Sequence, residues 1–268
     1  MPPVLRTPPP PEHWAAPDCL GRFPFDAARV RADWNQLHAG QPLPLPETDE
    51  LATAWALYHA GDFAAAAQAG HRIGGAGGAA LADQATAIYA NYVEPDDERR
   101  LALLRQVGER ALARHAADPG DVHALYWHAY ALGRHAQAVS VARALAQGLG
   151  GRLKDTLEQI IEQQPSHADA HFALGAFHAE VIDKVGELVA RMTYGVRAER
   201  AIELFERGLA LHPDSATGRV EYARALMALR GDAASAQVQQ LYEAAAAIEP
   251  MDARQCLDRE VALACMAD

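Results

Sequence analysis

The sequence repeats a pattern in which two helices follow one another and the pair ends at a proline. The clearest copy places Leu174 and Gly175 on its first helix, Ala201 and Phe205 on its second, and Pro213 at its end. Small residues at Gly175 and Ala201 allow two antiparallel helices to approach closely, and the larger side chains fill the space around that contact. A chain built from such pairs buries its core between helices, so we expect stacked helix pairs.

The composition supports this expectation. Of the 268 residues 59 are alanine, which is the best helix former and a poor strand residue. No stretch alternates between apolar and polar residues over a useful length, so we expect no sheet. Half of the residues are apolar, which excludes a disordered chain. The predicted fold class is therefore all-α.

Weaker copies of the pattern flank the clearest one. Residues 1–47 are expected to be a Pro-rich N-terminal segment with one short helix, which begins after Asp26. Residues 48–268 are expected to form the helical repeat domain. The predicted pairs, followed by a final helix, cover residues 48–75, 79–118, 121–165, 166–213, 214–250 and 252–267. The final helix should cap the last apolar face through Leu257, Val261, Ala264 and Cys265.

The clearest copy resembles the tetratricopeptide repeat, with His171 and His178 in place of two of its usual aromatic residues. Within that superfamily the central repeats resemble the regulator of microtubule dynamics family. The segments that carry this likeness are 124–131, 157–165 and 191–195. The resemblance implies a right-handed superhelical solenoid of αα-hairpins that binds other proteins. The alanine-rich composition is typical of a GC-rich bacterial gene, so the family's name implies no microtubule role here.

Two of the pairs are longer than a plain repeat. The closing prolines Pro119, Pro165 and Pro213 are 46 and 48 residues apart, against about 34 in the usual repeat. In the second long pair, about 14 added residues in one continuous helix would carry its end about 21 Å past its partner's start. The turn at 194–196 spans only about 10 Å. We therefore predict a break near 183–186 and a separate short helix that ends near Thr193.

The other long pair predicts a similar insertion. A short helix is expected at 137–147, followed by a break at the glycines of 148–151. The two extra helices, 137–147 and 184–193, are expected to stack side by side as a ridge. The ridge either binds a partner or only fills space between the longer helices.

The binding residues are expected on a stripe along the first helix of each pair, because this helix lines the concave face of such repeats. Exposed Tyr, Phe, Met and Arg together are typical of recognition surfaces. The predicted partner-binding groove comprises Tyr126, Tyr130, Arg134, Phe172, Glu180, Arg224 and Met227, with Ala176 and Val220 on the same stripe and Tyr89 as an extension.

The groove composition indicates what it could hold. Repeat proteins that grip a peptide carboxylate use Lys and Asn on this stripe, whereas Tyr126 and Tyr130 stand here. The surface suits an apolar or aromatic peptide, or the protein's own residues 1–25. The alternative is that Tyr126 and Phe172 are buried inside the stack.

A metal or small-ligand sensor is the alternative function. His167, His171 and His178 fall broadly on one face of a helix, and two histidines four residues apart can chelate zinc. The repeat pattern places His171 and His178 where packing aromatics belong, so we predict packed histidines and no metal or cofactor.

Charge and motifs exclude several other classes. The net charge of −11 disfavours a nucleic-acid partner and an anionic membrane surface. We find no signal peptide, membrane span, disulfide framework, phosphate loop or catalytic motif, so we predict a cytoplasmic protein that is not an enzyme. The predicted function is a scaffold or adaptor that binds a protein or peptide in the groove. Self-association as a homodimer is compatible with this fold class.

Overall fold

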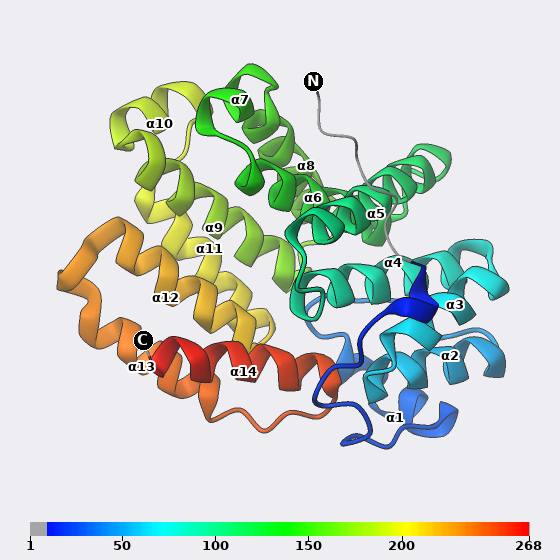
Figure 1. Cartoon of the computed structure of the whole chain (residues 1–268). Coiled ribbons are helices and arrows are strands. Elements are labelled where there is room, and N and C mark those ends of the chain that lie inside the picture. Colours follow the sequence, from blue (N-terminus) through cyan, green and yellow to red (C-terminus); the bar gives the residue numbers. More distant parts are fainter. Residues whose placement is uncertain (1–9, 268) are drawn as a thin grey trace. The chain divides into compact units, whose positions relative to one another are not determined.

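The computed structural model describes residues 10–267, apart from the side chains of Val141, Ala142 and Leu145. The first nine residues of the expected Pro-rich segment lie outside the described residues. Residues 10–267 contain helices and no strand, which confirms the all-α prediction (Figure 1). The helices are η1 (Pro11–His13), α1 (Ala27–Leu37), α2 (Asp49–Ala60), α3 (Phe63–Ile73), α4 (Gly75–Tyr92), α5 (Asp97–Ala117), α6 (Val122–Ala138), α7 (Val141–Ala146), α8 (Leu149–Gln163), α9 (Ala168–Val185), α10 (Glu187–Tyr194), α11 (Ala198–Leu211), α12 (Ala216–Arg230), η2 (Gly231–Ala234), α13 (Ser235–Ala246) and α14 (Ala253–Ala267).

Short polar side chains set the helix starts. Asp26 accepts a hydrogen bond from the Arg29 amide at 2.8 Å, so α1 begins where the sequence predicts. Asp62, Asp96 and Asp121 cap α3, α5 and α6 in the same way. These caps satisfy amide groups that the helices themselves leave unpaired.

The chain divides into two compact units. Unit 1 holds the described residues up to Leu37, Leu43–Val139 and Met251–Arg254. Unit 2 holds His38–Pro42, Ser140–Pro250 and the chain from Gln255 onward. Each unit thus contains one short segment that lies far away in sequence from the rest of it.

Unit 1 is a run of antiparallel pairs in which α3 packs on α4 and α5 packs on α6. Gly70 of α3 and Gly78 of α4 lie backbone to backbone, and a side-chain carbon on either one would collide with the other's carbonyl oxygen. Large buried side chains, among them Tyr58, Phe63 and Trp127, fill the rest of the interior. The alanine-rich sequence thus permits close helix contacts, and a few aromatics supply most of the bulk.

Unit 2 contains the clearest copy of the repeat. Helix α9 packs on α11, and α12 packs on α13 (Figure 1). A side-chain carbon on Gly175 would lie 2.9 Å from the Phe205 ring and 3.2 Å from the Ala201 carbonyl oxygen. Ala201 and Phe205 are fully buried. The close helix approach predicted from the motif is confirmed.

The predicted break in the second long pair is also confirmed. Helix α9 ends at Val185, Gly186 takes a positive φ of 81°, and α10 follows as a separate short helix. Gly195 then ends α10 in the left-handed region at φ 68°. Glycine suits both positions because it adopts positive φ at no steric cost.

The first insertion differs from its prediction in one respect. Helix α6 runs unbroken to Ala138, so the separate short helix α7 begins at Val141 and not at residue 137. The break after it is at Gly148, which is left-handed at φ 62°. Helix α7 packs on α8, and α10 packs on α9.

The predicted pair 121–165 is shared between the two units. Its first helix, α6, packs on α5 in unit 1, while α7 and α8 belong to unit 2. The sequence places helices here but does not reveal that α6 pairs with the helix before it.

Helix α14 covers an apolar face of unit 2, as a capping helix should. Ala262 packs among Val220 of α12 and Ala245 of α13, with Val261 and Cys265 at the edge of the same cluster. Ala264, which was expected on the buried side, is exposed.

Candidate functional site

The unit 1 part of the predicted stripe is largely packed. Tyr126 is 6% exposed, which matches the burial alternative stated for it. Tyr130 is half-buried, and the Arg134 guanidinium lies 5.1 Å from the centre of its ring. A cation over an aromatic face is a favourable contact, so Arg134 covers the exposed side of Tyr130.

The far end of the stripe, Tyr89, is covered by the N-terminal segment. The rings of Trp14 and Tyr89 stack at a centroid distance of 4.2 Å with an interplanar angle of 4°. Burial raises the pKa of Tyr89 above its ordinary value, and the neighbouring Glu94 adds to the rise. Trp14 belongs to residues 1–25, which the sequence offers as one possible occupant of the groove, and it packs on this position.

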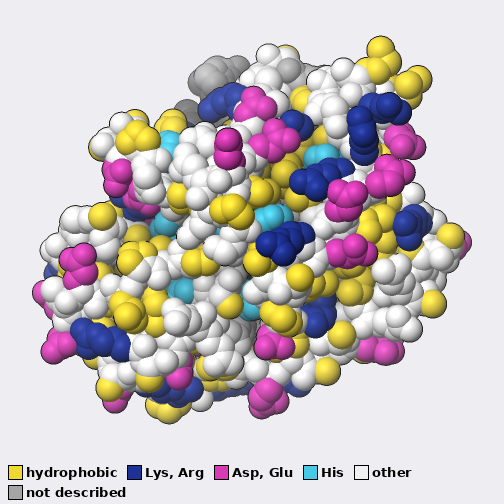
Figure 2. Space-filling model, turned by 180° about the vertical axis from the view of Figure 1, so that it is seen from behind, with side chains coloured by type: hydrophobic (Ala, Val, Ile, Leu, Met, Phe, Trp, Pro, Cys, Tyr) yellow, Lys and Arg dark blue, Asp and Glu magenta, His cyan; other side chains and the backbone are white. Residues whose placement is uncertain are grey.

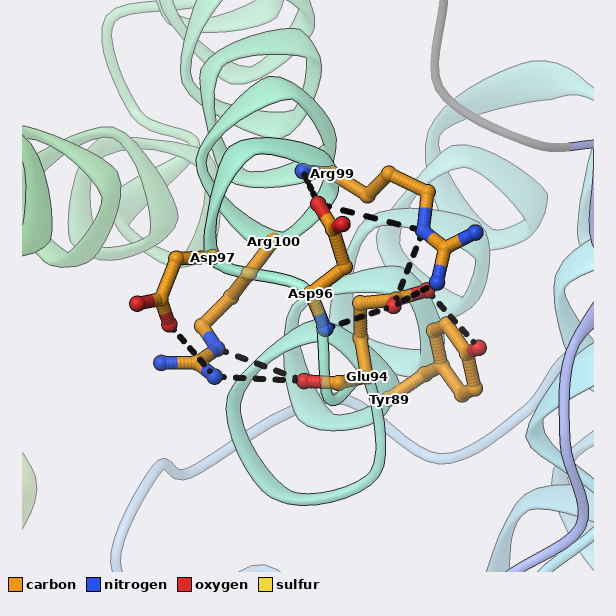
Figure 3. A network of polar contacts seen from close by, with 6 residues as sticks. All are labelled: Tyr89, Glu94, Asp96, Asp97, Arg99 and Arg100. Carbon is orange, nitrogen blue, oxygen red and sulfur yellow. Dashed lines mark hydrogen bonds and ion pairs between the residues drawn. The ribbon is translucent and has the colours of Figure 1, made fainter.

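A buried carboxylate organises the turn beneath Tyr89 (Figure 3). Glu94 accepts hydrogen bonds from the Tyr89 hydroxyl at 3.1 Å, from the Asp96 amide at 3.0 Å and from Arg99 Nε at 3.1 Å. Arg100 donates to the backbone carbonyl of Glu94. The network holds the connection between α4 and α5 in place. We therefore assign its charged residues a structural role and not a binding or catalytic one.

In unit 2 the stripe meets the protein's own interior and its own last helix. Phe172 is 4% exposed, and its ring lies against Gly208 and Gly218, which leave space for it. Val220 packs on α14, and Arg224 Nη2 lies 3.5 Å from the Cys265 sulfur. Helix α14 therefore occupies much of the surface that the sequence assigns to a partner on α12.

Three members of the unit 2 stripe reach solvent. Glu180 is half-buried and pairs with Lys184. Arg224 is exposed, although it also pairs with Glu221 at 2.9 Å, and Met227 is exposed. Ala176 packs at the edge of the core.

The histidine face is a set of packed side chains. His167 caps α9, because its Nδ1 accepts from the Ala170 amide at 3.2 Å. His171 Nδ1 lies 3.0 Å from the His167 carbonyl, and His178 Nδ1 contacts the backbone of Arg197. Burial lowers the pKa of all three, to about 4 for His167. No group of three or more His, Cys, Asp or Glu residues within 10–267 could hold a metal ion.

Two buried polar contacts in unit 1 had no signal in the sequence. His59 Nδ1 lies 2.7 Å from Asp252 Oδ2, although the two residues are 193 positions apart in the chain. Asp83 accepts from Arg110 Nε at 2.7 Å and from Arg114 Nη1 at 3.0 Å. Asp83, His59 and Asp252 are all buried, so we assign both contacts to stability.

The most exposed apolar surface of the described chain lies on α10. Met192 is 80% exposed, Leu188 72% and Val189 51%, and the first two are the most exposed of the large hydrophobic side chains described. The three fall on one face, because Met192 follows Leu188 by four residues and Val189 by three. Figure 2, seen from behind, shows hydrophobic side chains projecting at the upper right, where α10 lies. We call these three residues the α10 patch.

The inward side of α10 is fixed. Ala190 is fully buried, and the Tyr194 ring meets Phe177 of α9 edge-on at 6.0 Å. Tyr194 also packs against Gly150 of α8. Sequence reasoning singled out this helix as part of the ridge but did not identify the three patch residues. The sequence feature that could have identified them is the set of apolar residues at 188, 189 and 192, on a helix too short to bury two of its faces.

No protein-family model matches this sequence, and a search of curated proteins finds no match either. The likeness to tetratricopeptide repeats thus rests on the motif residues themselves. No helix within the described residues is long and apolar enough to cross a membrane.

Proposed function

We propose that this protein is a non-enzymatic scaffold of the tetratricopeptide-like class, a solenoid of helix pairs that binds another protein chain. The observation that carries the proposal is the α10 patch. Single exposed apolar residues are ordinary on a protein surface, but a cluster on one short helix indicates an interaction site. Leu188, Val189 and Met192 form such a cluster on a helix that its buried side holds in place.

The patch replaces the stripe as the main binding surface in this proposal. Tyr126 and Phe172 are too buried to contact a partner directly, and α14 lies on the α12 part of the stripe. The remaining stripe residues stay as candidates for separate secondary contacts, Tyr130 and Arg134 in unit 1 and Glu180, Arg224 and Met227 in unit 2. In this proposal the inserted residues of the long repeat supply the binding surface, because they form the helix that carries the patch.

The experiment is affinity capture from a lysate of the source cell with three proteins. These are the wild type, the double variant Leu188→Glu/Met192→Glu, and the control Leu112→Glu. Leu112 is also an exposed leucine on a helix, at 43% exposure, but lies on α5. A protein captured by the wild type and the control but lost by the double variant supports the proposal. A captured set that is identical for all three contradicts α10 as the binding surface.

Folding must be unchanged for the comparison to hold. All three substituted side chains are exposed, so we expect equal helix content and equal melting temperatures. The variants Tyr130→Ala and Arg224→Ala, tested in the same way, measure the contribution of the stripe.

A further inference from the structure

Residues 10–16 lie on unit 1 as an arm whose main side-chain contact is made by Trp14. The arm contains the short helix η1, and no residue of η1 is buried. Trp14 is half-buried and lies flat on the Tyr89 ring, with centroids 4.2 Å apart. The exposed residues of the arm are Pro10, Glu12, His13, Ala15 and Ala16. The arm is therefore held to Tyr89 chiefly by one aromatic stack.

The chain that follows the arm is anchored independently of that stack. Pro17 and Cys19 are buried. The Cys19 thiol donates to the Ala253 carbonyl at 3.7 Å, and the Gly21 amide donates to the Ala60 carbonyl at 3.4 Å. All of these residues belong to unit 1. Backbone rotation at 15–16 can thus lift the arm from Tyr89 while the chain from Pro17 onward keeps its contacts.

Tyr89 contacts both the side chain and the main chain of the arm. Its hydroxyl donates to Glu94 at 3.1 Å, and Figure 3 shows it turned toward that carboxylate. The same hydroxyl has a hydrogen bond with the backbone of Ala15. Because its single proton is directed to Glu94, the Ala15 amide is the donor in this bond. Trp14 itself is extended, at φ −77° and ψ 141°. Tyr89 therefore accommodates an extended chain in which an indole precedes a free backbone amide.

We propose that Tyr89 is a binding site for an extended, tryptophan-containing segment of another protein, and that the arm is its internal, displaceable occupant. The partner's indole takes the place of Trp14 on the ring, and the next backbone amide of the partner takes the place of the Ala15 amide. This site is in unit 1, whereas the α10 patch is in unit 2, so the inference does not depend on the patch.

The arm makes this site autoinhibited. Because the arm is tethered close to Tyr89, its effective concentration there is on the order of millimolar. A partner binds only to the fraction of molecules in which the arm is open, so its apparent dissociation constant is raised by the inverse of that fraction. Stacking on an aromatic face is a modest interaction, which allows a partner with further contacts to displace the arm.

The test is calorimetric titration of the full chain with a peptide of residues 10–18, blocked at both ends. Trp14→Ala leaves Tyr89 intact and removes the competing indole, so it should bind the peptide about tenfold more tightly than the wild type does. Trp14→Phe keeps a smaller ring in the arm and should gain about threefold. His13→Ala changes an exposed neighbour in the same arm and should bind as the wild type does.

Altered peptides test what the site recognises without any change to the folded chain. A peptide with alanine in place of its tryptophan should not bind to the Trp14→Ala chain. A peptide methylated on the backbone nitrogen of the following alanine lacks the donor to the Tyr89 hydroxyl and should bind about fivefold more weakly.

Three results would overturn the proposal. They are no binding of the peptide to the Trp14→Ala chain at about 1 mM, equal affinities of the wild-type and Trp14→Ala chains, and unchanged binding of the peptide that lacks its indole. We expect equal melting temperatures for all the chains, because Trp14 is only half-buried. If Trp14→Ala melts lower, Trp14→Phe and the altered peptides carry the comparison. None of these results bears on the capture of a protein through the α10 patch.

Discussion

His59 and Asp252 form a buried contact of 2.7 Å between side chains that are 1% and 2% exposed and that lie 193 positions apart in the sequence. The contact joins an imidazole nitrogen to a carboxylate oxygen, and both side chains are removed from water. The contact holds Met251–Arg254, the segment just before and at the start of α14, in unit 1.

Asp252→Ala should lower the free energy of unfolding by about 2–4 kcal/mol, because it removes the carboxylate that the buried His59 imidazole contacts. Glu249→Ala, three residues earlier and exposed, should change it by less than about 0.5 kcal/mol. Urea unfolding followed by circular dichroism measures both. Equal stabilities of the two variants would show that the contact contributes nothing.

His167 should make the protein acid-sensitive. Its pKa is about 4 in the folded state against 6.5 for an exposed histidine, chiefly through burial. The unfolded chain therefore binds a proton at this residue between pH 6.5 and 4 while the folded chain does not. Stability from this group is complete above pH 6.5 and falls as the pH falls, by about 2 kcal/mol at pH 5.

The variant His167→Asn isolates this effect, since Asn does not titrate and is a good helix cap. The difference in unfolding free energy between pH 7.5 and pH 5 should be smaller for the variant by about 2 kcal/mol. The same pH dependence in both proteins would refute the assignment.

Even the smallest substitution at Gly175, to alanine, should lower the stability of the fold. Gly175→Ala adds a carbon that presses on the Phe205 ring and the Ala201 backbone, so we expect a loss of about 1–3 kcal/mol despite the better helix propensity of alanine. Gly151→Ala places the same carbon in open space on α8 and should be neutral or stabilise by up to about 1 kcal/mol. Thermal melts of the two variants that shift in the same direction would contradict the close-contact account.

The buried carboxylate of Glu94 should contribute far more to the free energy of unfolding than the exposed carboxylate of Asp97. Glu94→Ala removes a buried acceptor of three hydrogen bonds and should cost about 2–4 kcal/mol. Asp97→Ala breaks only an exposed pair with Arg100 and should cost less than about 1 kcal/mol. Chemical denaturation of both variants checks the ratio.

The local features of the fold could be predicted because they depend on neighbouring residues. Gly175, Ala201 and Phe205 lie in one motif, and the break at Gly186 followed from how far a short turn can reach. The cap at Asp26 needed only the residues beside it.

The candidate site could not be predicted in the same way, because burial depends on which helices pack together. Phe172 of α9 is buried because two glycines on neighbouring helices, Gly208 of α11 and Gly218 of α12, leave space for its ring. The α12 part of the stripe, at Arg224, contacts α14. The sequence predicts that a final capping helix forms, but it does not predict where that helix packs. The His59–Asp252 contact joins residues so distant in the chain that no spacing rule connects them.

The most direct test of the account places a photo-crosslinking residue at position 192 and, as a control, at position 112. Both positions are exposed on helices, but only the first lies in the α10 patch. After illumination in the source cell, position 192 should give a discrete crosslinked protein product that position 112 does not give. If position 192 yields no product beyond that of position 112, the α10 patch is not a protein-binding surface.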